Sequence, residues 1–314
     1  MQLQLGDLTP DFYKPSKQLL AAINTALFLQ RPLLLAGEPG TGKTECADFI
    51  ARQLFRAHPD KFNSAQALRF NTKSTSQSVD LFYNYDAVAH FGDKTGKPKE
   101  NFISFSSLGV ALLATQPPNN AWTSFCNYDL EVLERKPAFG SVVLIDEIDK
   151  APRDFPNDLL AELEKPPFKF RIREIAGFEV KQNPEKPIPI VITSNNEKGL
   201  PDAFLRRCVF HYINFPEPDD LLTIVKSNLQ MENEFFTPAI ATFLQIRNKN
   251  MIKRPATSEL IDWISCLMQK GLLNENLSNW QQADIKYKQN IVDTLGIIAK
   301  SKPDFDTLSK EIGG

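Results

Sequence analysis

The feature that most constrains this chain is a glycine-rich segment between an apolar run and a helical pattern. The segment reads Gly-Glu-Pro-Gly-Thr-Gly-Lys-Thr and occupies positions 37–44. It follows the run Leu33–Ala36 and leads into the amphipathic pattern Lys43–Leu54. Glycines at this spacing let main-chain N–H groups converge on one point, and the start of a helix adds a positive dipole there. The order strand, G-x-x-x-x-G-K-[ST] loop, helix predicts a phosphate-binding loop.

The residue types in this loop have separate tasks. Main-chain N–H groups would face phosphate oxygens, the Lys43 ammonium would reach the β- and γ-phosphates, and the Thr44 hydroxyl would bind Mg²⁺. An ordinary Gly-Pro turn is the alternative reading of the same residues. The predicted nucleotide-binding residues are Gly37, Glu38, Pro39, Gly40, Thr41, Gly42, Lys43 and Thr44.

Two carboxylates end a second apolar run. Val142–Ile145 is followed directly by Asp146 and Glu147. Charges at the end of a buried strand are costly unless a cation faces them. We expect Asp146 to hold the Mg²⁺ and Glu147 to polarise the water that attacks the γ-phosphate. The alternative is that Asp146 only caps the helix that follows 149–152.

Apolar runs and helical patterns alternate along residues 1–215. A third run, Ile188–Ile192, resembles the first two, because all three are short and precede polar or glycine-rich loops. Such runs indicate strands buried on both faces, and the helical pattern Pro156–Glu164 lies between two of them. This order favours an α/β fold with a parallel sheet covered by helices on both sides. The polar stretch 91–101, flanked by aromatic residues, predicts an exposed insertion.

The segment Asn214–Asp220 contains two prolines and breaks this alternation. We place a linker there and expect two domains, 1–215 and 216–314. The second domain has helical patterns but no convincing strand, so we expect it to be small and all-helical. Its predicted helices are Asp219–Met231, Thr237–Asn248, Ser258–Lys270 and Ile285–Lys300.

Charge and composition restrict the function. The 314 residues carry 36 Lys and Arg against 38 Asp and Glu, a formal net charge of −2, which disfavours constitutive nucleic-acid binding. Four widely spaced cysteines and three histidines predict neither a zinc site nor a disulfide framework. No apolar run reaches the roughly 18 residues of a membrane span, and the first residues lack the pattern of a secretory signal. We therefore expect a cytoplasmic protein.

Polar residues after two later elements are further candidates. Asn195, with Asn196 as the second choice, follows the third apolar run and could hydrogen-bond the attacking water or the γ-phosphate. Arg206 and Arg207 end a short helical pattern. A planar guanidinium that stays ionised suits the spread charge of a phosphoryl group. Arginines at a helix C-terminus also complement the helix dipole without any catalytic role.

These motifs together resemble those of AAA+ ATPases, and the segment Leu144–Pro152 is similar to the MoxR branch. The resemblance spans most of residues 13–265. It implies a three-layer αβα P-loop domain of the ASCE/AAA+ type, with a parallel sheet of order 5-1-4-3-2 and a helical lid. It also implies an ATP-driven ring, usually a hexamer. In such a ring, Asn195 would correspond to sensor 1, and Arg206 or Arg207 to the arginine finger that reaches the neighbouring subunit's ATP.

The lid helix departs from the family pattern. Arg254 precedes Pro255, whereas the MoxR pattern places an arginine just after the proline. Arg254 is the candidate for sensor 2, which would contact the γ-phosphate and couple it to the lid. ATP is favoured by the family likeness and by the absence of an N-K-x-D guanine-reading segment.

The segment 168–180 alternates apolar residues with Lys169, Arg171 and Arg173, and Ala176-Gly177 permits a turn. This pattern predicts an amphipathic hairpin with one basic face. Its counterpart in the family lies near the pore of the ring. Contact with a substrate and a merely solvated basic face both explain the pattern.

The sequence thus predicts Mg²⁺-dependent ATP hydrolysis that drives remodelling or maturation of a partner protein. The family analogy suggests a von Willebrand factor A-type protein as that partner. Two other functions stay open, namely an oligomeric ATP-binding scaffold with incidental hydrolysis and a DNA-associated AAA+ module.

Overall fold

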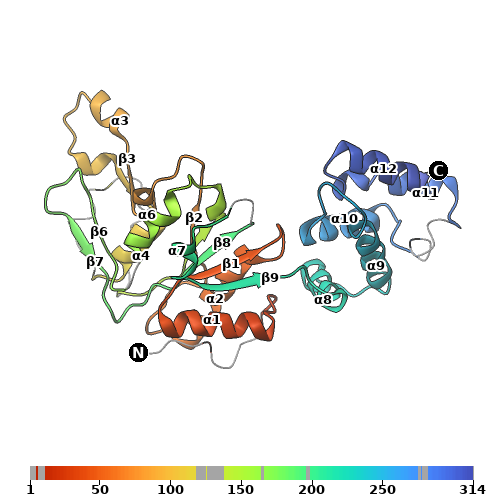
Figure 1. Cartoon of the computed structure of the whole chain (residues 1–314), viewed down its shortest axis with the longest axis horizontal. Coiled ribbons are helices and arrows are strands. Elements are labelled where there is room, and N and C mark those ends of the chain that lie inside the picture. The colour runs from red at the N-terminus through yellow and green to blue at the C-terminus, as the bar shows by residue number, and fades with distance from the viewer. Residues whose placement is uncertain are drawn as a thin grey trace. The chain divides into compact units, whose positions relative to one another are not determined.

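The computed structural model describes residues 5, 11–117, 125, 138–163, 166–195, 199–274, 277 and 282–313. The chain divides into two compact units (Figure 1). The first contains Met1–Gly37 and Gly42–Ile213, and the second contains Glu38–Thr41 and Asn214–Gly314. Glu38–Thr41, inside the glycine-rich loop, therefore groups with the helices of the second unit.

A five-stranded sheet forms the centre of the first unit. Its strands are β1 (Leu33–Gly37), β2 (Leu68–Asn71), β5 (Val143–Asp146), β8 (Ile190–Ser194) and β9 (Val209–Ile213). They stand in the order β2-β5-β8-β1-β9, and each neighbouring pair is parallel. The three apolar runs are thus confirmed as strands, at β1, β5 and β8. Numbered in chain order, the strands run 2-3-4-1-5 across the sheet.

Helices cover both faces of this sheet (Figure 1). Leu33 and Leu35 of β1 belong to one core cluster with helices α1 and α2, whereas Leu34 belongs to another cluster with α4 and α6. Alternate residues of a strand point to opposite faces, which explains this division. The expected α/β architecture is confirmed. The helices of this unit are α1 (Lys17–Leu29), α2 (Lys43–Ala57), α3 (Ala87–Gly92), α4 (Ser107–Ala114), α6 (Phe155–Glu162) and α7 (Asp202–Leu205).

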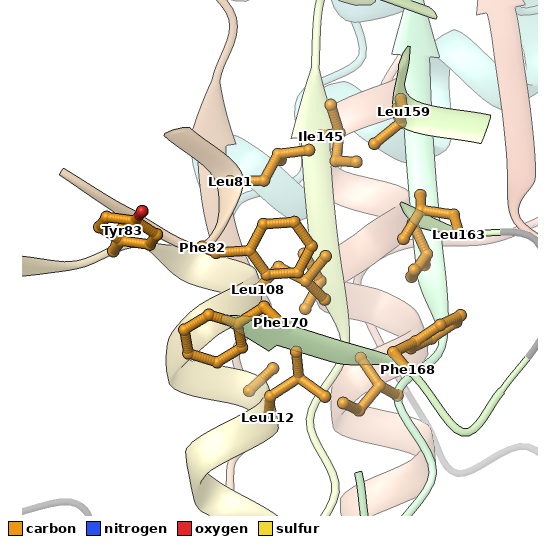
Figure 2. Close-up of a cluster of buried hydrophobic side chains, with 14 of the residues drawn as sticks. Leu81, Phe82, Tyr83, Leu108, Leu112, Ile145, Leu159, Leu163, Phe168 and Phe170 are labelled. Carbon is orange, nitrogen blue, oxygen red and sulfur yellow. The ribbon is translucent and has the colours of Figure 1, made fainter. Parts of the chain in front are cut away.

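Two short hairpins extend one of these core clusters. One pairs β3 (Tyr83–Tyr85) with β4 (Ile103–Phe105), and the other pairs β6 (Lys169–Arg171) with β7 (Glu179–Lys181), both antiparallel. Figure 2 shows Phe170 of β6 among the buried side chains that also include Ile145 of β5. The Phe170 ring centroid lies 5.3 Å from that of Phe82 and 6.2 Å from that of Phe105. The predicted hairpin at 168–180 is confirmed.

The expected insertion at 91–101 is largely exposed, but it is not a simple loop. It contains the end of α3 and the 3-10 turn η2 (Lys99–Phe102), which leads directly into β4. The Phe91 side chain on α3 is 84% exposed. Other 3-10 turns are η1 (Ser78–Leu81) and η4 (Ile148–Lys150) in this unit and η7 (Leu295–Ile297) in the second unit.

The α-helices described in the second unit are α8 (Pro218–Leu229), α9 (Phe236–Arg247), α10 (Thr257–Gln269), α11 (Ile285–Val292) and α12 (Lys302–Gly313). The predicted helix Ile285–Lys300 is wrong at its end, because α11 stops at Val292 and η7 follows. The chain turns there because the Thr294 hydroxyl accepts a hydrogen bond from Trp263 Nε1 (2.8 Å) and donates one to the Ile291 carbonyl (2.7 Å). Helix α12 was not expected. None of the helices in the described ranges has the length and hydropathy needed to cross a membrane.

Candidate phosphate-binding site

Parallel strands bring the predicted site residues to one edge of the sheet. The carboxyl ends of parallel strands meet at the same edge, which is the usual ligand-binding edge of an open α/β sheet. Ala36 of β1 pairs with Ser194 of β8, and Ile145 of β5 pairs with Ile192 of β8. The glycine-rich loop after β1, Asp146 at the end of β5 and Asn195 just after β8 therefore lie along this edge.

The glycine-rich loop ends where α2 begins, as the sequence predicts. Gly42 precedes the first residue of α2 and has a φ of 82°, in the left-handed region that favours glycine. A Cβ atom at Gly42 would lie only 3.2 Å from the ring of Tyr13. Lys43 is buried, and its Nζ donates a 2.9 Å hydrogen bond to the Gly37 carbonyl. The lysine therefore bends back toward the residue that opens the loop.

Thr44 and Asp146 supply oxygen atoms that face each other. The Thr44 hydroxyl lies 3.2 Å from Asp146 Oδ1 and 3.3 Å from Oδ2. Mg²⁺ prefers oxygen ligands, usually takes only one or two carboxylates from a protein, and completes its shell with phosphate and water. The two residues fit this demand. Within the described ranges no group of three or more His, Cys, Asp or Glu side chains could hold a metal ion.

The alternative role of Asp146 as a helix cap has no support among the described residues. Its carboxylate accepts hydrogen bonds from two side-chain hydroxyls, those of Thr44 and Thr193. No main-chain N–H of η4 or α6 donates to it in the described part of the chain.

Glu147 stands directly after the strand in an unusual backbone conformation. Its φ is 55°, in the left-handed region that residues other than glycine rarely adopt. Asn195 Nδ2 donates a 3.1 Å hydrogen bond to Glu147 Oε1, and the Lys150 ammonium pairs with Oε2. The Asn195 main-chain N–H in turn donates to the buried Asp149 carboxylate at 3.1 Å. The first-choice asparagine thus contacts the proposed water-polarising acid, whereas Asn196 lies outside the described residues.

Arg206 and Arg207 follow α7 and are both exposed. Arg207 Nη1 lies 3.4 Å from the Ala203 carbonyl, which is one turn earlier. Within the described ranges the Arg206 guanidinium makes no hydrogen bond or ion pair, and neither arginine bonds to Asp146 or Glu147. The two arginines are therefore available on the surface and lie outside the hydrogen-bonded group around Glu147.

The second unit places two arginines beside Glu38. Arg254, the sensor 2 candidate, has a 60% exposed side chain, and its Nη1 lies 4.0 Å from Glu38 Oε1. Arg247, which belongs to no motif recognised in the sequence, has a 6% exposed side chain and pairs with Glu38 Oε2. Its guanidinium also lies 3.6 Å from the centre of the Phe215 ring. A Cβ atom at Gly40, whose φ is 71°, would lie 2.4 Å from that of Ala256, so this loop position needs glycine.

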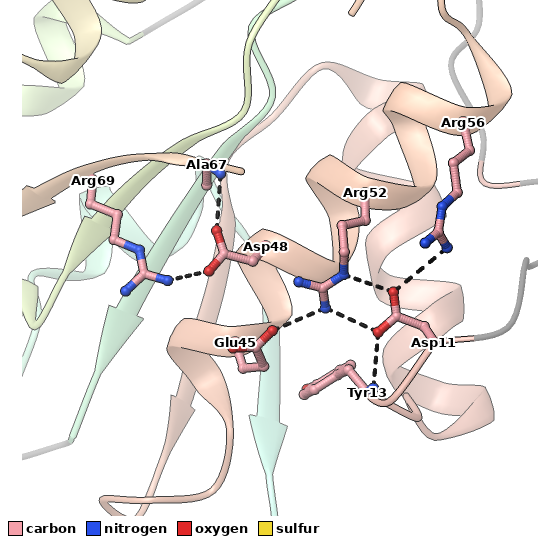
Figure 3. Close-up of polar contacts among 8 residues, drawn as sticks. All are labelled: Asp11, Tyr13, Glu45, Asp48, Arg52, Arg56, Ala67 and Arg69. Carbon is pink, nitrogen blue, oxygen red and sulfur yellow. Dashed lines mark hydrogen bonds and ion pairs between the residues drawn. The ribbon is translucent and has the colours of Figure 1, made fainter. Parts of the chain in front are cut away.

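Ion pairs fasten the N-terminal segment to α2 (Figure 3). Asp11 accepts hydrogen bonds from Arg52 Nε at 2.8 Å and from Arg52 Nη2 at 3.0 Å, and Arg52 also pairs with Glu45. Burial acts to raise the pKa of Asp11, but the hydrogen bonds from Arg52 and from the Tyr13 main-chain N–H outweigh it and hold that pKa below its usual value. On the same helix, the Asp48 carboxylate pairs with Arg69 of β2 and accepts a hydrogen bond from the N–H of Ala67, just before β2. These contacts position the helix that begins at the glycine-rich loop.

Two further titratable groups are Cys46 and His211. Burial raises the pKa of the Cys46 thiol to about 12, as expected for a small buried side chain inside α2. His211 on β9 is partly buried, and burial lowers its pKa. A cavity of about 110 Å³ opens at the opposite edge of the sheet, where Pro32 precedes β1 and Pro189 precedes β8.

Comparisons with known proteins find weak similarities to solved structures. No protein-family model and no curated protein matches the sequence. Among the solved structures that match are the FIGL-1 AAA domain in complex with ADP and a structure that describes katanin self-assembly. The first is 15% identical over 90% of this chain and 72% of that chain, with a TM-score of 0.38. The second is 16% identical over 90% and 77%, with a TM-score of 0.40, and similarities at this level assign no function to the chain.

Proposed function

We propose that this chain is a Mg²⁺-dependent ATPase of the AAA+ type, similar to the MoxR branch. The observation that carries the proposal is the meeting of the Thr44 hydroxyl and the Asp146 carboxylate, 3.2 Å apart, beside Glu147. Two segments separated by about a hundred residues thus supply the ligand types that a metal–triphosphate complex requires.

The residues of this edge divide the chemistry among them. Main-chain N–H groups of the glycine-rich loop and the Lys43 ammonium would bind the phosphate oxygens. Thr44 and Asp146 would hold Mg²⁺, which supplies charge neutralisation for the phosphates when bound. Glu147 would accept a proton from the attacking water, and Asn195, which already bonds to Glu147 Oε1, would orient both. ATP, rather than GTP, is the proposed nucleotide because the sequence has no N-K-x-D segment.

We extend the proposal to a ring in which nucleotide lies between subunits. An arginine that contacts phosphate across such an interface must be exposed in the single chain, and Arg206 and Arg207 both are. Arg206 is the better candidate because its guanidinium has no partner within the described ranges. The helices from α8 to α12 would form the lid, with Arg254 or Arg247 as its basic contact. The work of the ring would be done on a partner protein in the cytoplasm, with a von Willebrand factor A-type protein as the family analogue.

Steady-state hydrolysis of ATP and GTP by the purified chain tests this proposal. We expect Mg²⁺-dependent release of phosphate from ATP by the wild type. Lys43→Ala should abolish nucleotide binding, and Glu147→Gln should retain binding but lower kcat about 100-fold or more, because a general base is worth that much. Lys186→Ala is the control, since that residue lies at the far end of the sheet near Asp60. Hydrolysis that survives unchanged in Glu147→Gln would contradict the proposal. A scaffold with incidental hydrolysis would instead keep its function in Glu147→Gln, whereas a motor would trap ATP and lose its function.

A further inference from the structure

We propose that Thr193 is a positioning residue that joins the metal-holding carboxylate of Asp146 to the main chain of Glu147. The proposal rests on the proposed function, because it concerns the same site. Thr193 lies on β8, next to β5, and its side chain is fully buried. Nothing in the sequence pattern singles it out, since it ends a run of apolar residues before the polar turn.

The hydroxyl of Thr193 contacts Asp146 and Glu147, and the chemistry of these two groups fixes the direction of both hydrogen bonds. Thr193 Oγ1 lies 2.5 Å from Asp146 Oδ1 and 2.8 Å from the main-chain nitrogen of Glu147. An ionised carboxylate can only accept, and an N–H group can only donate. The single hydroxyl proton must therefore go to Asp146, while a lone pair of Oγ1 accepts from Glu147. The hydroxyl cannot rotate without breaking one of the two bonds.

The hydrogen bond from the Glu147 main chain to Thr193 helps to set the direction of the Glu147 side chain. Glu147 has a φ of 55°, a conformation that costs energy for a residue with a Cβ atom and persists only where surrounding contacts hold it. The Thr193 hydroxyl holds the amide of this residue at a fixed place next to β8. The carboxylate of Glu147 therefore projects from a fixed main chain toward Asn195, which is two residues beyond Thr193.

The bond to Asp146 bears on metal binding. In the part of the chain that the structure describes, Asp146 has two hydroxyl donors, Thr44 and Thr193. The Thr44 hydroxyl is the one assigned to the metal, so Thr193 is the donor that keeps the carboxylate in place when the metal is bound. When a metal-binding carboxylate loses the hydrogen bond that orients it, the affinity of the site for the metal typically falls about 10–100-fold.

Two substitutions at Thr193 distinguish the effect of its hydroxyl group from the effect of its side-chain volume. Thr193→Val replaces the hydroxyl by a methyl group of similar size, and Thr193→Ser keeps the hydroxyl. The probes are Mn²⁺ affinity in the presence of ADP, measured by electron paramagnetic resonance, and ADP affinity in EDTA. For Thr193→Val we expect Mn²⁺ binding to weaken by about tenfold or more, with ADP affinity in EDTA changed by less than about twofold. Its kcat should fall more than its KM rises, whereas Thr193→Ser should stay within about threefold of the wild type in every measurement.

Several outcomes would overturn the role of Thr193. One is that Thr193→Val binds Mn²⁺ as tightly as the wild type does. Another is that Thr193→Ser loses as much Mn²⁺ affinity as Thr193→Val. If the wild type itself does not hydrolyse ATP, the proposed function fails, but the Mn²⁺ comparison still decides the role of Thr193. Should Thr193→Val not fold, hydrogen exchange of the Glu147 amide in the wild type decides. Slow exchange supports the bond to Thr193, and exchange at the rate of an open loop overturns it.

Discussion

At the scale of single residues, the hydroxyls of Thr44 and Thr193 both donate to the Asp146 carboxylate, and the Asn195 amide donates to Glu147. Lys43, Thr44, Asp146 and Glu147 stand out by motif and by the ends of apolar runs, and the parallel sheet brings them to one edge. Their catalytic roles stay predictions. Thr193 could not be found in the same way, because its importance depends on which strand lies beside β8.

A pH-dependent contribution to stability belongs to Asp11. Because its folded-state pKa is lowered, its contribution is present above the unfolded-state pKa of about 3.9 and is lost as the pH falls through the folded-state value. We expect Asp11→Asn to lower the free energy of unfolding by about 1–3 kcal/mol at pH 7. At pH 3 and below, the difference from the wild type should shrink.

Urea unfolding at both pH values measures this effect. Asp306→Asn is the matched control, because Asp306 is exposed on α12 and should change stability by less than about 0.5 kcal/mol at either pH. A loss in Asp11→Asn that is the same at pH 7 and pH 3 would show that the ion pair with Arg52 is not its cause.

At the scale of elements, secondary structure that follows from the spacing of apolar residues along the chain could be predicted from the sequence. The alternation in 168–180 predicted a hairpin, and the structure pairs Phe170 with Val180 across β6 and β7. The contact between this hairpin and the one formed by β3 and β4 was not predicted, because it joins strands of three residues that are far apart in the chain. Helix α12 was missed although Ser301, just before it, exchanges hydrogen bonds with the main chain and the carboxylate of Asp304. A role of the basic face in binding a partner stays a prediction.

The aromatic packing of this hairpin can be tested with two phenylalanines. Phe170 is 5% exposed and packs against Phe82, whereas Phe91 is 84% exposed. We expect Phe170→Ala to lower the free energy of unfolding by about 3–5 kcal/mol, because it leaves a cavity. Phe91→Ala should change it by less than about 0.5 kcal/mol. Equal effects of the two substitutions in urea unfolding would mean that β6 does not pack into this core.

At the scale of the whole molecule, the apolar runs and the proline-containing segment 214–220 predicted an α/β part followed by a helical part. The structure adds that Glu38–Thr41 groups with the helices of the second unit. The sequence could not indicate this grouping, because it depends on contacts such as that of Arg247 with Glu38. The ring and its partner protein are questions about several chains and stay proposals.

Self-association can be examined with the hydrolysis-deficient chain. We expect Glu147→Gln to form a ring-sized species in sedimentation velocity when ATP and Mg²⁺ are present. Arg206→Ala should lower kcat about 10-fold or more, without changing nucleotide affinity, if its guanidinium completes the neighbouring site. Arg207→Ala is the matched variant. A monomer under all conditions, with full activity of Arg206→Ala, would contradict the ring.

We propose that this sheet edge binds ATP and that Glu147 enables cleavage of its terminal phosphate bond. A single-turnover experiment with radiolabelled ATP bound to excess protein distinguishes binding from cleavage. The wild type should convert the bound ATP to ADP and phosphate when Mg²⁺ is added, and Glu147→Gln should keep it as ATP over the same time. Equal conversion in the two chains, or bound ATP that the wild type never cleaves, would contradict the account.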